Sequence, residues 1–189
     1  LIPMGLFNYG GLMAIQTLWA GPWMIRVAGY TPLESATGLF WINITMLISY
    51  FIWGYILPKI SEYGISSIKL IKLGLPISYF SLFLIIYFGK NAGAFLFTLY
   101  IMTSIVISLT QPAIALNFSK NLAGKSLTSY NVFLFSGTFF IQWGIGLVID
   151  LCNNNGFDIL SSYRISFSVF LILCVLSYIF FIYLNKNEN

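Results

Sequence analysis

The chain contains no histidine and only two cysteines in 189 residues. Zinc, haem and iron–sulfur sites are built largely from these two residue types, at recognisable spacings. Cys152 and Cys174 do not have the spacing of a ligand pair, and we expect no disulfide between them. The sequence therefore predicts no metal site and no other cofactor.

Charged residues are equally scarce, at 7% of the chain, against about 25% in an average soluble domain. All five acids are expected in loops or at helix ends: Glu34, Glu62, Asp150, Asp158 and Glu188. A hydrolase needs a nucleophile with a base beside it, and the sequence offers neither that pair nor a phosphate-binding loop. We therefore expect no enzyme, and we find no resemblance to a nucleic-acid-binding module.

Hydrophobic residues are what the chain has in abundance, at 59%, and they form six long runs separated by short polar turns. A bilayer core of about 30 Å requires about 20 apolar residues in a helix. The runs predict spans at about 4–26, 33–57, 69–89, 92–117, 126–151 and 162–184. Unbroken runs lack the alternation of barrel strands. The expected fold is an all-α membrane protein, with one six-helix bundle over residues 1–189 in contact with the lipid bilayer.

Basic residues divide unevenly between the two sides of this expected bundle. Six fall on one side and three on the other: Lys59, Lys69, Lys72, Lys120, Lys125 and Lys186 against Arg26, Lys90 and Arg164. Because basic residues mark the cytoplasmic side, we expect both termini in the cytoplasm, and a bacterial inner membrane as the location.

Two turns carry further signals. Thr31, Pro32 and Glu34 form a capping-box pattern, which predicts a sharp helix start. On the opposite side, a loop over 54–64 is expected between the second and third spans, with a glycine at each end and a lysine between them.

This loop resembles the signature loop of major facilitator superfamily transporters. Gly54, Lys59 and Gly64 match the pattern, whereas Pro58 stands where an acid is usual. Residues 18–23 (LWAGPW) and 111–113 (QPA) are similar to stretches in the second half of such transporters.

The resemblance implies that the chain is the C-terminal six-helix half of a twelve-helix transporter, with a solute site near the midplane between the halves. Because Leu1 is not an initiator methionine, we expect a fragment whose partner is the N-terminal half of the same polypeptide. Any titrating residue for ion coupling would lie in that other half. The resemblance also implies that the third and sixth helices stand outside as supports, while the other four border the pathway.

Polar residues inside those four spans are the candidates for the substrate pathway, because polar groups in a membrane usually face protein or water. Helical periodicity places them on one face of each span. They are Asn8, Gln16 and Trp19 in the first span, Asn43 and Tyr50 in the second, Tyr100, Ser104 and Gln111 in the fourth, and Asn131, Thr138 and Gln142 in the fifth. Pro112 predicts a kink in the fourth span.

Other interpretations of these residues remain open. Ser104, Thr138 and Asn43 also suit hydrogen bonds between helices, and Trp19 and Trp23 suit an interfacial aromatic belt. The expected function is secondary active transport of a small solute by alternating access, with the substrate undetermined. The alternatives are a six-helix carrier that pairs with a copy of itself, and a membrane scaffold or sensor subunit that transports nothing.

Overall fold

The computed structural model describes residues 1–184, in which the chain is helical and no strand occurs. This confirms the all-α class. Five helices are long and apolar enough to cross a membrane, over Pro32–Glu62, Ser67–Asn91, Ala94–Asn117, Asn121–Asn154 and Ile159–Leu184, with mean hydropathies from 1.5 to 2.7. They correspond to five of the six predicted spans, with ends that differ by a few residues.

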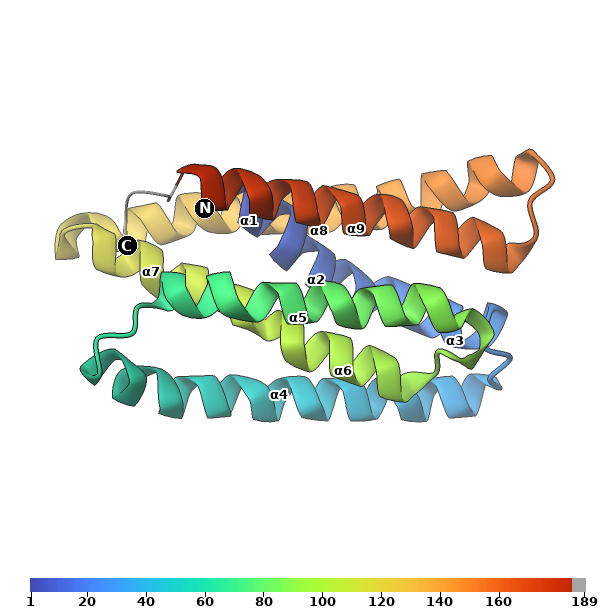
Figure 1. The fold of residues 1–189 in the computed structure, drawn as a ribbon, viewed down its shortest axis with the longest axis horizontal. Coiled ribbons are helices and arrows are strands. Elements are labelled where there is room, and N and C mark those ends of the chain that lie inside the picture. Colours follow the sequence, from blue (N-terminus) through green and yellow to red (C-terminus); the bar gives the residue numbers. More distant parts are fainter. Residues whose placement is uncertain (185–189) are drawn as a thin grey trace.

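The first predicted span, 4–26, is helical but irregular. It consists of α1 (Ile2–Met4), the π-helical η1 (Gly5–Tyr9), α2 (Gly10–Ala14), the π-helical η2 (Ile15–Trp19) and α3 (Ala20–Arg26). In Figure 1 this segment crosses the bundle obliquely, from beside α8 (Lys120–Asn154) toward the start of α4 (Pro32–Glu62). π turns of this kind are rare and occur often at functional sites.

A close approach of two backbones holds this N-terminal segment against α8. A Cβ placed on Gly10 would lie 2.5 Å from the carbonyl carbon of Gly137, and one placed on Gly137 would lie 2.1 Å from the Leu6 oxygen. Small residues at helix contacts allow such proximity in membranes, where packing rather than the hydrophobic effect drives association. The glycines therefore set the distance between the two helices.

The loop predicted over 54–64 is wrong for most of its length, because α4 continues to Glu62. Gly54 and Lys59 lie inside the helix, and only Gly64 lies in the turn, with a φ of +74° that suits glycine. Lys59 Nζ sits 2.6 Å from the hydroxyl of Tyr55, one turn earlier, which supports the last turns of α4.

The capping box at the other end of α4 is confirmed. Glu34 N donates to Thr31 Oγ1 at 3.3 Å, and Thr31 N donates to the Glu34 carboxylate at 2.8 Å. These reciprocal bonds satisfy backbone donors that the first helical turn leaves free. The helix therefore begins sharply at Pro32.

The fourth predicted span consists of three pieces: α6 (Ala94–Ser104), the 3₁₀ turn η4 (Ile105–Leu109) and α7 (Thr110–Asn117). The irregularity that Pro112 predicts therefore lies just before the proline, as a tightened turn. A 3₁₀ turn winds about 120° per residue instead of 100°, so five such residues rotate the face of α7 by about 100° relative to α6.

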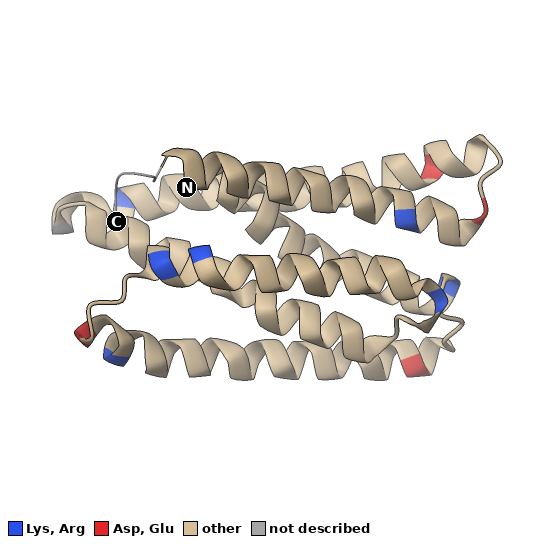
Figure 2. Cartoon of the chain, viewed as in Figure 1, with Lys and Arg blue, Asp and Glu red and all other residues tan. Residues whose placement is uncertain are grey.

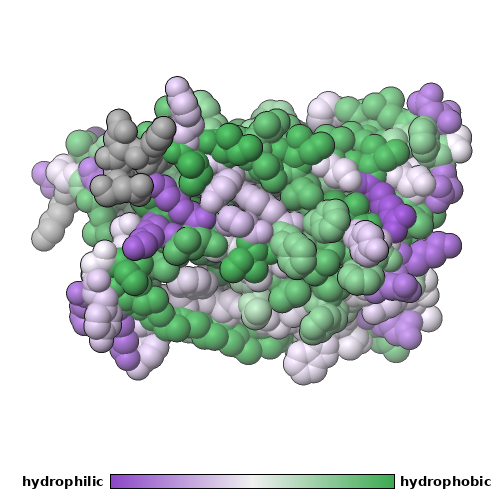
Figure 3. Space-filling model, viewed as in Figure 1, coloured by the Kyte–Doolittle hydropathy of each residue, from purple (hydrophilic) through white to green (hydrophobic). Residues whose placement is uncertain are grey.

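The remaining helices, α5 (Ser67–Phe88) and α9 (Ile159–Leu184), run beside the others along the long axis (Figure 1). Among these five segments, the apolar part of Ala94–Asn117 is the most buried, at 50%, and that of α4 is the least buried, at 11%. Helices α4 and α8 thus present much of their apolar surface outward. Figure 3 shows that green, hydrophobic residues cover much of one face of the molecule.

Charged side chains lie near the two ends of the bundle and are absent from its middle among the residues described (Figure 2). One end carries Arg26 and Asp150, and the other carries Lys59 and Lys69. We call these the Arg26 end and the Lys59 end. Two charged residues named above, Lys186 and Glu188, lie outside the described part of the chain.

An aromatic core fills the bundle toward the Arg26 end. The fully buried Trp23 packs on Phe167 at 4.7 Å between ring centroids, and edge-on against Tyr163 and Phe97 at 5.8 and 6.0 Å. Its indole Nε1 donates to the Ala92 carbonyl at 3.1 Å. The assignment of Trp23 to an interfacial belt is therefore wrong, because the ring lies inside the protein.

Candidate functional site

A cluster of neutral polar side chains links the N-terminal segment to α4 and α8. Gln16 in η2 donates through Nε2 to Asn43 Oδ1 of α4 at 2.5 Å. On the other side of the same segment, Thr17 Oγ1 accepts from Gln142 Nε2 of α8 at 2.9 Å. The consecutive residues Gln16 and Thr17 thus bond to α4 and α8, the two least buried of the long helices.

Trp19 completes this cluster. Its Nε1 donates to the Gln142 carbonyl at 3.1 Å, and its ring meets Tyr163 edge-on at 6.1 Å. The half-buried ring therefore packs against α8, next to Gln142. Gln16, Thr17, Trp19, Asn43 and Gln142 together are called the amide cluster below.

The members of the amide cluster lie at similar depths. Gln16, Asn43 and Gln142 are ten, eleven and twelve residues from the ends of their helices at Arg26, Pro32 and Asn154. At a rise of 1.5 Å per residue, this is about 15–18 Å, or about half of a 30 Å bilayer core. The cluster therefore sits near the middle of the apolar thickness.

Asn43 and Thr17 are exposed even though the surface around them is apolar. Large hydrophobic side chains on the same two helices are also exposed, such as Leu47 at 52% on α4 and Trp143 at 60% on α8. A polar group facing lipid at this depth is costly, whereas one facing water or a second protein surface is not. The exposed Asn43 and Thr17 therefore suit a surface that faces either a second protein surface or an aqueous passage.

Asn8 does not join the cluster. It is 5% exposed, donates to Ser177 Oγ of α9 at 2.8 Å and accepts from the Tyr79 hydroxyl of α5 at 2.8 Å. Asn8 instead ties the third and sixth helices to the first.

The predicted stripe of the fourth span is also divided. Tyr100 and Ser104 are buried at 3% each, and with Asn8 and Tyr79 they border a cavity of about 10 Å³. Gln111 is half-buried on α7. The intervening 3₁₀ turn supplies the rotation that separates them, so the prediction of one shared face is wrong. Tyr100 and Ser104 are buried, and the Ser104 hydroxyl has no hydrogen-bond partner among the residues described.

The other predicted pathway residues lie on the cluster's side of the bundle without joining it. Thr138 donates to the Leu134 carbonyl of its own helix at 3.1 Å. Asn131 is half-buried beside Tyr130, whose hydroxyl donates to Thr110 Oγ1 at 2.9 Å. The half-buried Tyr50 hydroxyl interacts with that of Tyr9, between α4 and η1.

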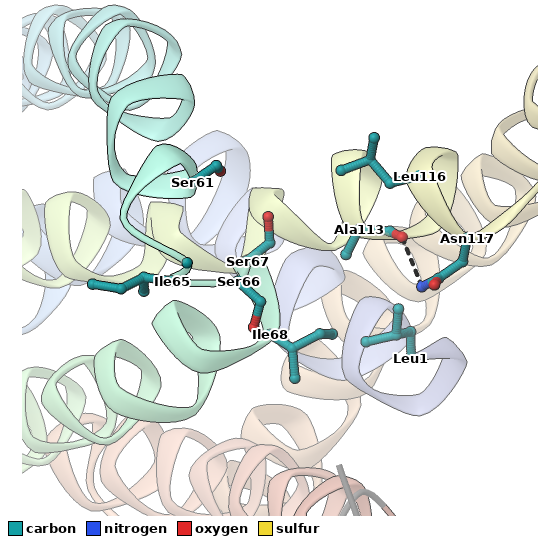
Figure 4. A pocket seen from close by; sticks show the side chains of 10 residues that line it. Leu1, Ser61, Ile65, Ser66, Ser67, Ile68, Ala113, Leu116 and Asn117 are labelled. Atoms are coloured by element: carbon teal, nitrogen blue, oxygen red, sulfur yellow. Dashed lines mark hydrogen bonds between the residues drawn. The ribbon is translucent and has the colours of Figure 1, made fainter. Parts of the chain in front are cut away.

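A hollow of about 640 Å³ opens at the Lys59 end, between the α4–α5 turn and α7 (Figure 4). Gly64 lines it, together with Ser61 and Ser66 from the turn, and Asn117 across from them donates to the Ala113 carbonyl at 2.9 Å. Of the residues that resemble the signature loop, only Gly64 borders this hollow. It contains none of the predicted pathway residues.

Sequence reasoning missed Thr17, although it is adjacent to Gln16. On a regular helix the two residues point 100° apart, so a stripe drawn through Gln16 leaves Thr17 out. In the structure each of them serves a different neighbouring helix. No group of three or more potential metal ligands occurs in residues 1–184.

In comparisons with known proteins, no family model, no curated protein and no solved structure matches this chain.

Proposed function

We propose that this chain forms one six-helix bundle of a secondary active transporter of the major facilitator type, which moves a small solute by alternating access. The amide cluster carries the proposal: neutral hydrogen-bonding groups from three helices converge at mid-depth on a surface that is otherwise apolar. In such transporters the solute site lies near the midplane between two bundles. The exposed sides of α4 and α8 would face the second bundle.

The irregular N-terminal segment supports the same proposal. Its two π turns lie at the level of its contacts with α8, and η2 contains Gln16, Thr17 and Trp19. Discontinuous helices are a recurring feature of transporter binding sites. In the proposed function this segment is the first of the six spans and borders the pathway.

The proposed orientation places the Lys59 end in the cytoplasm. That end carries Lys59, Lys69, Lys72 and Lys125 with Glu62, whereas at the Arg26 end three bases are matched by three acids, Arg26, Lys90 and Arg164 by Glu34, Asp150 and Asp158. The excess of lysine at the Lys59 end follows the positive-inside rule. The inner membrane of a bacterium is the proposed location.

Thiol labelling in the membrane tests whether the amide cluster faces water. In a Cys152→Ser background, Gln142→Cys and Thr17→Cys are treated with a membrane-impermeant thiosulfonate. Phe140→Cys is the matched control, because Phe140 lies two residues from Gln142 and lines an apolar groove toward α9. The proposal expects both cluster cysteines to react and the control to stay unmodified. Equal lack of reaction at all three positions would reject the aqueous pathway.

The intact mass of the native polypeptide separates the one-chain transporter from the self-paired carrier. A mass near twice the 21.3 kDa of this chain supports two bundles in one polypeptide. A mass equal to it, with labelling of both cluster cysteines, favours a carrier made from two copies. A scaffold or sensor subunit predicts no labelling of either cysteine.

A further inference from the structure

We infer that the amide cluster binds an uncharged solute through the solute's hydroxyl groups, an inference that rests on the proposed function and specifies its substrate class. The inference follows from which donors and acceptors of the cluster the protein itself already uses. Two separate chains of hydrogen bonds, one toward α4 and one toward α8, determine this.

Toward α4, a backbone carbonyl fixes the direction of every bond. Asn43 Nδ2 donates to the Leu39 carbonyl at 2.7 Å, and a carbonyl can only accept, so Asn43 must turn its oxygen to Gln16. Gln16 then has to donate through Nε2. Its Oε1 is left buried without a hydrogen-bond partner among the residues described. A buried acceptor without a donor is destabilising, so a donor from a solute would be favourable there.

Toward α8, a second carbonyl has the same effect. The Thr17 hydroxyl donates its only proton to the Met13 carbonyl at 2.6 Å, so Thr17 Oγ1 can only accept from Gln142. Gln142 therefore uses Nε2 for this bond. Its Oε1 forms no hydrogen bond with any residue that the structure describes. Both glutamines thus have a free oxygen and one remaining N–H each.

A hydroxyl group matches this pattern because it can donate to the free Gln142 oxygen and accept from the remaining N–H. It can do the same at Gln16 once that side chain, whose oxygen is buried in this structure, turns toward the solute. A carboxylate or phosphate only accepts, so it would leave Gln16 Oε1 unsatisfied and would find no basic side chain at this depth (Figure 2). An ammonium group only donates and would find no carboxylate there. An uncharged, hydroxyl-bearing solute is therefore the class that the cluster fits best.

Protection from thiol labelling tests this class directly. Leu47→Cys, in the Cys152→Ser background, is the reporter, because Leu47 lies one turn from Asn43, is 52% exposed and is not part of the cluster. Three groups of solutes are added before the thiosulfonate: glucose, mannitol and myo-inositol; choline and putrescine; citrate and glycerol 3-phosphate. We expect protection by at least one member of the first group and by none of the others.

A second variant links protection to the unpaired oxygen. Gln16→Met keeps the size of the side chain and removes the amide, and we expect the half-protecting concentration to rise about tenfold, the effect of losing hydrogen bonds worth about 1.4 kcal/mol. Phe140→Leu, which alters only the apolar groove toward α9, should leave it unchanged. Melting temperatures of both variants show whether the bundle is intact.

The outcomes separate this inference from the proposed function. Protection by charged solutes alone, protection by no member of the hydroxyl group, or unchanged protection in a folded Gln16→Met variant overturns the inference. If neither Leu47→Cys nor Gln142→Cys reacts without solute, the aqueous pathway itself is absent and the proposed function fails with it.

Discussion

Replacing Gly137 with alanine should separate the N-terminal segment from α8 and weaken the whole bundle. The new Cβ would lie 2.1 Å from the Leu6 backbone oxygen and 2.8 Å from its carbonyl carbon, and real Cβ contacts do not fall below 3.0 Å. The obstacle is backbone, so no side-chain rotation can relieve it. The two helices have to move apart by about 1 Å.

The expected loss of stability follows from three contributions. Overpacking of this kind costs about 1–3 kcal/mol. The displacement also stretches two hydrogen bonds of Gln142, one that it donates to Thr17 and one that it accepts from Trp19, worth about 0.5–1.5 kcal/mol each. Alanine regains about 0.5–1 kcal/mol over glycine within a helix. The net destabilisation should be about 1–5 kcal/mol.

Unfolding in detergent micelles, followed by circular dichroism as a denaturing detergent is added, measures this loss. Gly144→Ala is the matched control, because it lies on the same helix and nothing stands within 4 Å of the added Cβ. We expect Gly144→Ala to be neutral or slightly stabilising. If Gly137→Ala unfolds together with this control, the close contact between the two backbones is refuted.

Three other predictions concern single side chains. Arg164 donates to the Ile86 and Tyr87 carbonyls in the last turn of α5, at 2.9 and 2.7 Å. Arg164→Ala should speed hydrogen exchange in the turn between α5 and α6. Arg164→Lys should restore only part of the protection, because lysine lacks the planar fork of the guanidinium group. Hydrogen bonds from Ser161 hold the pKa of the Asp158 carboxyl below its ordinary value of 3.8, so the stability this group gives α9 is present above that value and is lost as the pH falls through the lowered pKa. Asp158→Asn should remove this acid dependence from melting curves; an unchanged curve would contradict it. Trp23→Phe removes the donor to the Ala92 carbonyl and part of a fully buried ring, and should cost about 2–3 kcal/mol in the same unfolding assay, whereas a loss below about 0.5 kcal/mol would mean that the ring is not packed as described.

The helices themselves were predictable because membrane thickness leaves a strong signal in hydropathy. Five predicted spans correspond to helices that are long and apolar enough to cross a membrane, with ends that differ by a few residues. The start of α4 was predictable as well, since Thr31 and Glu34 act through bonds within a single turn. Its other end was not, because Gly54 and Pro58 usually interrupt helices but are tolerated here.

The amide cluster was predictable only in part, because stripes drawn on regular helices fail where the helix is irregular. Gln142 and Asn43 lie on unbroken helices and bond to Thr17 and Gln16 of the N-terminal segment. Asn8 lies within the π-helical η1, and Gln111 follows the rotation that η4 adds. Such local changes of pitch depend on tertiary contacts, which no single stretch of sequence records.

The two π turns have a consequence for insertions and deletions in this chain. A π turn holds one residue more than the α-helical turn it replaces, since its hydrogen bonds span five residues rather than four. Deleting one residue within Gly5–Tyr9 or Ile15–Trp19 can therefore return that turn to α-helix and leave the residues beyond it in register. The same deletion in α2 or α3 would rotate everything beyond it by about 100°. An alignment of future relatives should therefore place its single-residue gaps in these two turns.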